Sequence, residues 1–262
     1  MDKLDPVTFE ARADVAVVTL AHHESRNALS SGMLDGLARA LERTAREQMR
    51  ALVLRSDGRV FCSGGDLSGV NEALEGDVDS EIGAMVDQLH GVIRSLRDLP
   101  MPSLAAIGGP AVGAGIALAL ATDVRVVARS ATFSTGYIGV GASPDGGVSF
   151  HLARSLGSQQ ALSAFLLNRR FSSDEIRSLG LADELVDDAE LDGTAMVLAA
   201  HLAKLPFGAV LAMRKLAYSA STHSLETHLD AEREQFLRVA HSDAFRRGIA
   251  PFARVRQSQE AI

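Results

Sequence analysis

Two glycine-rich segments of this 262-residue chain could bring backbone N–H groups close to a ligand. The first, residues 61–67, follows a run typical of a buried strand, and Gly113-Ala114-Gly115 opens a short apolar run after another. Amides in the first turn of a helix lack internal partners, and the helix dipole adds to their attraction for negative charge. If the segments face one another, two N–H groups could hold one carbonyl oxygen and stabilise the enolate or tetrahedral oxyanion formed from a thioester.

Glycines in either segment alone are better explained by tight turns and close helix packing, which need a small residue. The occurrence of two such segments, each directly after a strand, is what favours an oxyanion hole.

The apolar pattern predicts the elements that position these segments. Residues 7–11 and 15–20 are expected to form a hairpin, and Ser30 precedes a helical pattern that reaches Ala45. A strand at 51–54, a helix at 81–96, a strand at 103–107, a helix at 116–121 and a strand at 124–127 are expected to follow. The order of strand, glycine-rich turn and helix therefore repeats.

The later chain, residues 146–261, has an almost wholly helical pattern, and it is expected to be interrupted near Ser172, Asp187, Pro206 and His223. Residues 77–80 are expected to form a polar loop and a mobile flap beside a site.

Composition excludes several classes of function. The net charge of -7 and the absence of a basic run argue against nucleic acid as a partner. No apolar stretch reaches the roughly 18 residues that span a bilayer, so no membrane partner is expected. Cys62 is the only cysteine and the N-terminal segment has no apolar core, so we expect an unprocessed cytoplasmic protein. The histidines lack the paired spacing of a metal site, and no metal is expected.

Five segments resemble the crotonase, or enoyl-CoA hydratase/isomerase, superfamily. They are Arg26-Asn27-Ala28-Leu29, residues 61–67, residues 105–123, Pro144-Asp145-Gly146-Gly147, and residues 245–252. The resemblance covers almost the whole chain. It implies an α/β fold, a crotonase-like spiral of repeated ββα units with a C-terminal helical region. It places the spiral core in residues 1–200 and a helical trimerisation region in 201–262, and it implies a homotrimer or homohexamer.

The family's two oxyanion N–H groups fall on Gly65 and Ala114 in this sequence, where alanine replaces the commoner glycine. Gly108 stands where the family usually has asparagine. The two glutamates with which the family's hydratases orient water fall on Ala117 and Tyr137. Neither is a carboxylate, so the resemblance does not support hydration by that pair.

Asp145 is the leading candidate base, because the resemblance places it where isomerase-type members carry an aspartate in a similar Pro-Asp-x-Gly-Gly run. A carboxylate there could take a proton from the α or γ carbon of a thioester and return it elsewhere. Pro-Asp-Gly-Gly is also turn chemistry, and Asp145 could cap a helix beginning at Val148. Both interpretations stay open. Tyr137 could donate to the substrate or only shape the pocket.

A dehalogenase of this family, which acts on 4-chlorobenzoyl-CoA, places a nucleophilic aspartate where Asp145 stands, and His90 matches a histidine of that enzyme. A histidine among the apolar residues of the expected 81–96 helix is more often a pocket wall than a base. Asp66 is expected to fix its loop, and Cys62 to be a small buried apolar residue.

The family also implies binding of CoA by Arg26, Ala28 and Ser63, with adenine and phosphates near Phe252 and Arg256. CoA would be part of the substrate, so no separate cofactor is expected. The resemblance therefore implies an acyl-CoA enzyme, an isomerase or lyase, for which isomerisation of a double bond is favoured over hydration by two glutamates. The alternatives are a non-catalytic acyl-CoA-binding homologue and, as a minor possibility, dehalogenase-like activity.

Overall fold

The computed structural model describes residues 6–259, with side chains described as far as Phe252. The chain forms two compact units, which meet in sequence between Ala203 and Lys204. Each unit is described by itself.

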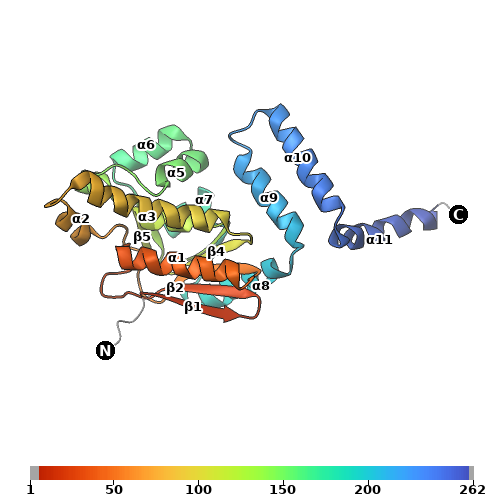
Figure 1. Ribbon diagram of the computed structural model, residues 1–262, viewed down its shortest axis with the longest axis horizontal. Helices are drawn as coiled ribbons and strands as arrows, with labels where there is room; N and C mark the ends of the chain where they lie inside the picture. Colours follow the sequence, from red (N-terminus) through yellow and green to blue (C-terminus); the bar gives the residue numbers. More distant parts are fainter. Residues whose placement is uncertain (1–5, 260–262) are drawn as a thin grey trace. The chain divides into compact units, whose positions relative to one another are not determined.

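A six-stranded sheet forms the centre of the first unit, in the order β1-β2-β3-β4-β6-β9 (Figure 1). The expected hairpin, antiparallel β1 (Val7–Arg12) and β2 (Val15–Leu20), is confirmed. The strands that pair in parallel beyond it are β3 (Ala51–Ser56), β4 (Ser103–Ile107), β6 (Val124–Ala128) and β9 (Glu184–Val186). Most of these strands are nearly continuous apolar runs, as is typical of parallel sheet covered on both faces.

A second sheet has three short strands, β5 (Pro110–Val112), β7 (Thr132–Ser134) and β8 (Arg170–Ser172). β4 and β5 lead into α4 (Ala114–Leu120), and β6 and β7 lead into α5 (Val148–Leu156) and α6 (Ser158–Leu166). In these two turns the chain gives one strand to each sheet and then continues into helix, whereas β1 and β2, which precede α1, both belong to the large sheet. The predicted α/β fold of repeated ββα units is confirmed.

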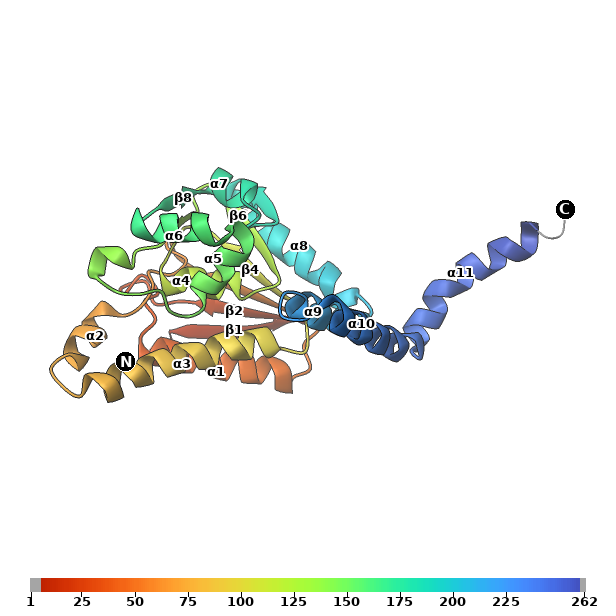
Figure 2. The ribbon, with the colours of Figure 1, turned by 90° about the horizontal axis from the view of Figure 1, so that it is seen from above.

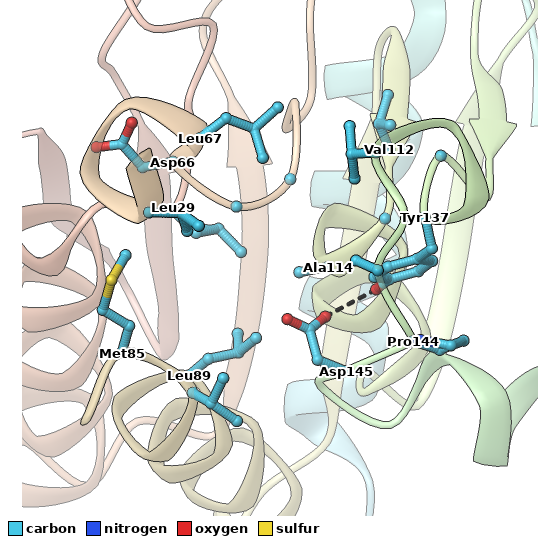
Figure 3. Close-up of a pocket in the computed structure, with 18 of the residues that line it drawn as sticks. Leu29, Asp66, Leu67, Met85, Leu89, Val112, Ala114, Tyr137, Pro144 and Asp145 are labelled. Carbon is cyan, nitrogen blue, oxygen red and sulfur yellow. Dashed lines mark hydrogen bonds between the residues drawn. The ribbon is translucent and has the colours of Figure 1, made fainter. Parts of the chain in front are cut away.

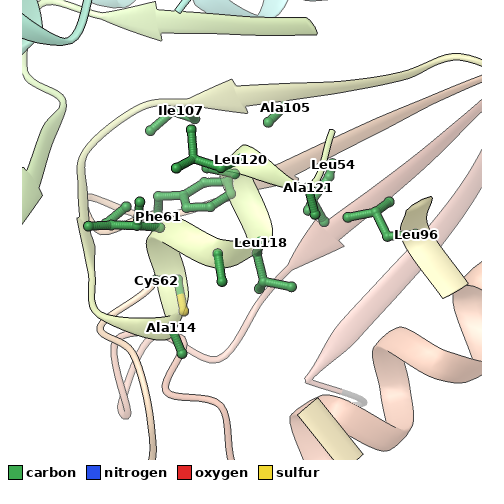
Figure 4. Close-up of a cluster of buried hydrophobic side chains, with 14 of the residues drawn as sticks. Leu54, Phe61, Cys62, Leu96, Ala105, Ile107, Ala114, Leu118, Leu120 and Ala121 are labelled. Carbon is green, nitrogen blue, oxygen red and sulfur yellow. The ribbon is translucent and has the colours of Figure 1, made fainter. Parts of the chain in front are cut away.

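Helices cover both faces of the large sheet (Figure 2). α1 (Ser31–Arg46), α3 (Val78–Asp98) and α4 share a core with one face, which includes Leu52 and Leu54 of β3. Ala51 and Val53, which alternate with them, face α8 (Leu191–Lys204) on the other side. Figure 4 shows that Phe61 and Cys62, which begin the first glycine-rich segment, share one buried apolar cluster with Ala114 and Leu118 of α4.

The prediction of a loop and flap at residues 77–80 is wrong, because α3 begins at Val78. Asp77 caps α3, and its carboxylate accepts a hydrogen bond from the Ser80 N–H at 3.3 Å. A further helix, α2 (Leu67–Ala73), begins directly after the first glycine-rich segment. Asp66 and Asp77 therefore each begin a helix, because an Asp carboxylate can accept hydrogen bonds from the otherwise unpaired amides of the first turn.

The later part of the first unit is less helical than the pattern predicts. β8 ends at Ser172 and β9 ends at Val186, so two of the expected interruptions are strands. The short helical elements between the larger ones are η1 (Ile138–Val140), α7 (Ser173–Ser178) and η2 (Asp188–Glu190).

Helices make up the described part of the second unit, as the sequence predicts. They are α9 (Phe207–Ser219), α10 (Leu225–Ala240) and α11 (Asp243–Gln259). α9 and α10 pack against each other. Among residues 6–259, no single helix has both the length and the apolar composition to cross a membrane, although the bent pair Asp188–Lys204 and Phe207–Ser219 passes that test together.

Candidate active site

A cavity of about 880 Å³ opens in the first unit, between α2 and α3 on one side and the η1–α5 segment on the other (Figure 3). Apolar side chains dominate both walls. The wall from α2 and α3 contains Leu67, Val70, Ile82, Met85, Val86 and Leu89, and the opposite wall contains Val112, Val140, Ala142 and Pro144.

The two glycine-rich segments lie against each other at the base of this cavity. The Phe61 N–H donates to the Pro110 carbonyl at 3.0 Å, and the Val112 N–H donates to the Cys62 carbonyl at 3.0 Å. A Cβ atom on Gly64 would lie 2.7 Å from the Val112 oxygen, so a larger residue would separate the two segments. Glycine is required there by close backbone approach as well as by its positive φ of 93°.

Two backbone N–H groups remain available at this junction. Gly65 and Ala114 both line the cavity, and within the described chain neither N–H donates to a backbone carbonyl. Ala114 is the first residue of α4, so its N–H has no acceptor within the helix. An ideal Cβ on Gly64, next to Gly65, would lie 3.8 Å from the Ala114 nitrogen. This geometry suits stabilisation of an oxyanion by two donors.

Asp145 and Tyr137 form the polar centre of the opposite wall. The Tyr137 hydroxyl donates to the Asp145 carboxylate at 2.8 Å, the dashed line in Figure 3. Burial, together with the negative charge of Asp145, raises the pKa of Tyr137 far above its usual value. The tyrosine is therefore a neutral donor and the carboxylate is its acceptor.

Asp145 does not cap α5 with its side chain. Gly147 occupies the cap position of that helix, and no side chain satisfies the first-turn amides there. Only the backbone carbonyl of Asp145 contributes, by accepting the Val148 N–H at 3.1 Å. Of the two interpretations of Asp145, the structure leaves a carboxylate that lines the cavity.

His90 lines the same cavity from α3, and its Nε2 accepts a hydrogen bond from the Gly146 N–H at 3.3 Å. Gly146 has a φ of 57°, and a Cβ atom there would lie 2.9 Å from the Cβ of Ala117. Ala117 is fully buried and does not line the cavity. The turn that carries Asp145 therefore rests on α3 and α4.

The residues predicted to contact CoA are divided between the two units. Ser63 lines the cavity, and its N–H donates to the Arg26 carbonyl at 3.1 Å. Arg26 is exposed and Ala28 is half-buried in the loop beside it, and neither lines the cavity. Phe252 is exposed on α11, and Arg256 lies on the same helix with its side chain outside the described residues.

Asp66 and Cys62 have the structural roles that the sequence predicts. The Asp66 carboxylate accepts from the Ser68 N–H at 3.2 Å and caps α2. Cys62 is fully buried, and burial raises the pKa of its thiol to about 12. A thiol in that state is not a nucleophile at neutral pH. No cluster of three or more metal-ligating side chains occurs among residues 6–259.

His90 lines the pocket as the sequence predicts, but neither the apolar wall nor the contact of His90 with Gly146 was predicted. The wall could have been found from the three- and four-residue spacing of apolar residues such as Ile82, Met85 and Leu89, which marks one helix face. The helix α2, which forms the rest of this wall, was not predicted, because it has seven residues and directly follows a glycine-rich segment. The His90 contact joins residues 56 positions apart and leaves no local signal.

Comparison with protein families gives a match over residues 10–259 to the family described as "Enoyl-CoA hydratase/isomerase". A Rhodobacter capsulatus protein described as a probable enoyl-CoA hydratase is 34% identical over 247 residues, which covers 94% of each chain. The 1,2-epoxyphenylacetyl-CoA isomerase of Escherichia coli is 34% identical with the same coverage. A 4-chlorobenzoyl coenzyme A dehalogenase of an Arthrobacter species is 28% identical over 94% of this chain and 90% of its own.

Solved structures give the same grouping. An enoyl-CoA hydratase from Polaromonas sp. JS666 superposes with a TM-score of 0.90 and 32% identity, covering 94% of this chain and 96% of that one. A Thermobifida fusca YX protein, provisionally described as an enoyl-CoA hydratase and solved with acetoacetyl-CoA, gives a TM-score of 0.81 and 30% identity, with 91% and 96% coverage.

Proposed function

Because the chain belongs to the enoyl-CoA hydratase/isomerase family and is an acyl-CoA enzyme, we propose that it shifts the double bond of an enoyl-CoA by proton transfer. One observation carries this proposal. The Asp145 carboxylate, fixed by Tyr137, lines the same cavity as the unpaired N–H groups of Gly65 and Ala114. A base and an oxyanion site in one cavity are the two parts that enolate chemistry needs.

The proposed reaction begins when Asp145 removes a proton from the α carbon of a 3-enoyl-CoA. The electron pair of the broken C–H bond moves into the thioester, and the negative charge on its oxygen is held by the N–H groups of Gly65 and Ala114. The protonated Asp145 then returns the proton to the γ carbon, which gives the 2-enoyl-CoA. The proton and electrons balance within the substrate and one carboxyl group, so the reaction needs no separate cofactor or metal.

Tyr137 is a positioning residue in this proposal. Its hydroxyl is kept protonated by burial and by the charge of Asp145, so it can donate to the carboxylate throughout the neutral range. The hydrogen bond directs one carboxylate oxygen toward Tyr137 and leaves the other for the substrate.

Two features oppose hydration by a pair of glutamates. The first family position is Ala117, which is buried behind Gly146 rather than exposed in the cavity. The second is Tyr137, which donates to Asp145. A single carboxylate in this arrangement suits transfer of one proton between two carbons of the substrate better than addition of water.

The acyl group is proposed to be apolar, because aliphatic and thioether side chains predominate along the wall from α2 and α3, where His90 is the polar exception within the helices. The polar groups of the opposite wall gather near Asp145 and Tyr137, where the reacting carbons would lie. A charged or polyhydroxylated acyl end would lose its hydration in such a cavity without gaining partners.

The direct test is the isomerisation of a 3-enoyl-CoA by wild type and by Asp145→Asn. We expect kcat to fall by roughly 10²- to 10⁴-fold, the usual effect of losing one acid–base group. Asp87→Asn, at an exposed carboxylate on α3, is the matched control and should retain full activity. Equal rates for wild type and Asp145→Asn would remove Asp145 from the mechanism.

Two alternatives make different predictions. A non-catalytic acyl-CoA-binding protein would bind acyl-CoA in calorimetry without turnover of any enoyl-CoA. Dehalogenase-like activity, for which the Arthrobacter relative is the precedent, would release chloride from 4-chlorobenzoyl-CoA. In that alternative Asp145 would act as a nucleophile, so a covalent adduct at Asp145 detected by mass spectrometry would favour it.

CoA itself is proposed to bind along Arg26, Ala28 and Ser63, with Phe252 and Arg256 contributing near its adenine and phosphates. A homotrimer or homohexamer is proposed as the assembly, because α10 and α11 expose large apolar side chains in the described chain.

A further inference from the structure

We propose that His90 is a positioning residue, which fixes the backbone of the turn carrying the Asp145 base by accepting the Gly146 N–H. The inference rests on the proposed function of Asp145. It assigns to His90 a role different from acid–base chemistry on the substrate.

The turn is held at two points on two different groups. Tyr137 binds the Asp145 side chain at 2.8 Å, and His90 binds the N–H of the next residue, Gly146, at 3.3 Å. A hydrogen bond to the side chain alone would fix one carboxylate oxygen while the backbone could still move. The second contact fixes the Cα position from which the carboxylate extends.

The packing of the turn against α3 and α4 explains why the Gly146 N–H points at His90. Gly146 adopts a φ of 57°, and its Cα faces Ala117 of α4 and Leu89 of α3. A Cβ there would lie 2.9 Å from Ala117 and 3.2 Å from Leu89, so the glycine is enclosed by both helices. His90 follows Leu89 directly on α3, and the same helix thus supplies the apolar contact and the hydrogen-bond acceptor.

The direction of this hydrogen bond identifies the tautomer of the ring that can form it. A backbone N–H can only donate, so Nε2 of His90 must carry its lone pair and the ring proton must be on Nδ1. Nε2 is therefore occupied by the turn and cannot also remove a proton from the substrate. The base assignment stays with Asp145.

The test compares His90→Gln, which keeps a neutral acceptor, with His90→Leu, which has none. In the 3-enoyl-CoA assay we expect His90→Leu to lower kcat by about 10- to 100-fold with little change in KM, because small misplacement of a catalytic group has effects of this size. His90→Gln should retain most of the activity. His151→Gln, at another half-buried histidine, is the control and should match wild type.

A double-mutant cycle separates positioning from a general structural effect. If His90 acts through Asp145, His90→Leu should cost nothing more in an Asp145→Asn background. If His90→Leu does not fold, His90→Phe keeps the ring shape without an acceptor and is measured in its place.

Three results would overturn the inference: equal activity of wild type and His90→Leu, equal impairment of His90→Gln and His90→Leu, or additive effects of His90 and Asp145 substitutions. Undiminished activity of Asp145→Asn would instead count against the proposed function and against the inference that rests on it. The two failures are thus distinguished by the single Asp145 variant.

Discussion

The residue pair Tyr137 and Asp145 shows how one hydroxyl can take a position where relatives are expected to carry a second carboxylate. Two carboxylates can share a water molecule and accept its protons, whereas a tyrosine held neutral by burial and a neighbouring charge keeps its own proton and donates it to a hydrogen bond. The hydrogen bond at 2.8 Å therefore makes Tyr137 a partner of the base and not a second base.

Removing the Tyr137 hydroxyl is predicted to lower kcat while the enzyme still binds substrate. A hydrogen bond to a charged group contributes about 1.5–3 kcal/mol, so Tyr137→Phe should reduce kcat roughly 10- to 100-fold with KM little changed. Steady-state kinetics on a 3-enoyl-CoA would measure this. Tyr218→Phe, which changes the chain's other tyrosine, should behave as wild type. A kcat for Tyr137→Phe equal to that of wild type would show that the contact does not matter.

At this scale the sequence predicted the glycine-rich segments well, because glycine at a close approach leaves a mark in the residue type itself. It left open whether Asp145 caps a helix or lines a cavity, since both uses favour the same turn residues. Only the three-dimensional arrangement brings Tyr137 and His90 to that turn, from positions 8 and 56 residues away.

Among the elements, the turn between η1 and α5 depends on how closely it approaches α4. Gly141 and Gly146 both have positive φ, at 70° and 57°, but only Gly146 is enclosed by side chains. Substitutions at the two glycines can therefore distinguish the effect of backbone strain from the effect of steric conflict.

Gly146→Ala is predicted to impair the enzyme much more than Gly141→Ala. Both substitutions place an alanine in the left-handed region, at a cost of about 1–2 kcal/mol. The Gly146 variant must also displace the turn from Ala117, which moves Asp145. Urea unfolding and kcat would be measured together. Both variants should lose stability through backbone strain, and Gly146→Ala should lose more through the added steric conflict and should also show a selective loss of kcat. Equal kcat values in the two variants would show that packing of the turn against Ala117 does not position Asp145.

α5 contains a histidine that should make stability fall in acid. Burial lowers the pKa of His151 to about 4, and the positive charges of three arginines add to this effect, those of Arg97, Arg125 and Arg154. In the unfolded chain the ring protonates near its ordinary pKa of 6.5, so protonation favours unfolding as the pH falls from 6.5 to 4. Above pH 6.5 the ring is neutral in both states, so His151 does not lower the stability of the folded protein there.

The difference in the free energy of unfolding between wild type and His151→Gln is predicted to be constant above about pH 7. As the pH falls toward 4, the free energy of unfolding of the wild type should decrease by up to about 3 kcal/mol relative to that of His151→Gln. Urea unfolding over this range would measure it, with His201→Gln, at an exposed histidine of α8, as the control. A constant difference across the whole range would rule out a buried neutral His151.

The longer elements were predictable because their apolar period extends over several turns or strand repeats. β5, β7, β8 and β9 were not, since each has three residues and exists through pairing with a neighbour. Their formation depends on strands distant in sequence, such as β9 on β6. Residues 77–80 were misjudged because a polar cap and a polar loop have similar compositions.

At the scale of the whole molecule, the exposed apolar side chains of the second unit are the basis for the proposed assembly. Leu225, Leu229 and Phe236 recur at helical spacing on α10, and their side chains are 68%, 52% and 63% exposed. A stripe of this kind on a monomer is expected to associate.

Charged substitutions in that stripe are predicted to dissociate the proposed trimer or hexamer. The double variant Leu229→Lys, Phe236→Lys should have the mass of a monomer in light scattering after size exclusion, while wild type has that of three or six chains. Leu162→Lys is the matched control, because Leu162 is equally exposed, at 52%, on α6. Wild type with the mass of a single chain would refute the assembly.

The contact between Ala117 and Gly146 also constrains how such a protein could change its reaction in evolution. Because even a Cβ on Gly146 would lie 2.9 Å from the Ala117 Cβ, we expect that a glutamate at position 117 would disturb the turn that carries Asp145, the proposed base. If Asp145 is the base, a mutational path from this site to one with two glutamates would have to move the turn first. The two sites would then be separated by impaired intermediates, even though only a few substitutions lie between them.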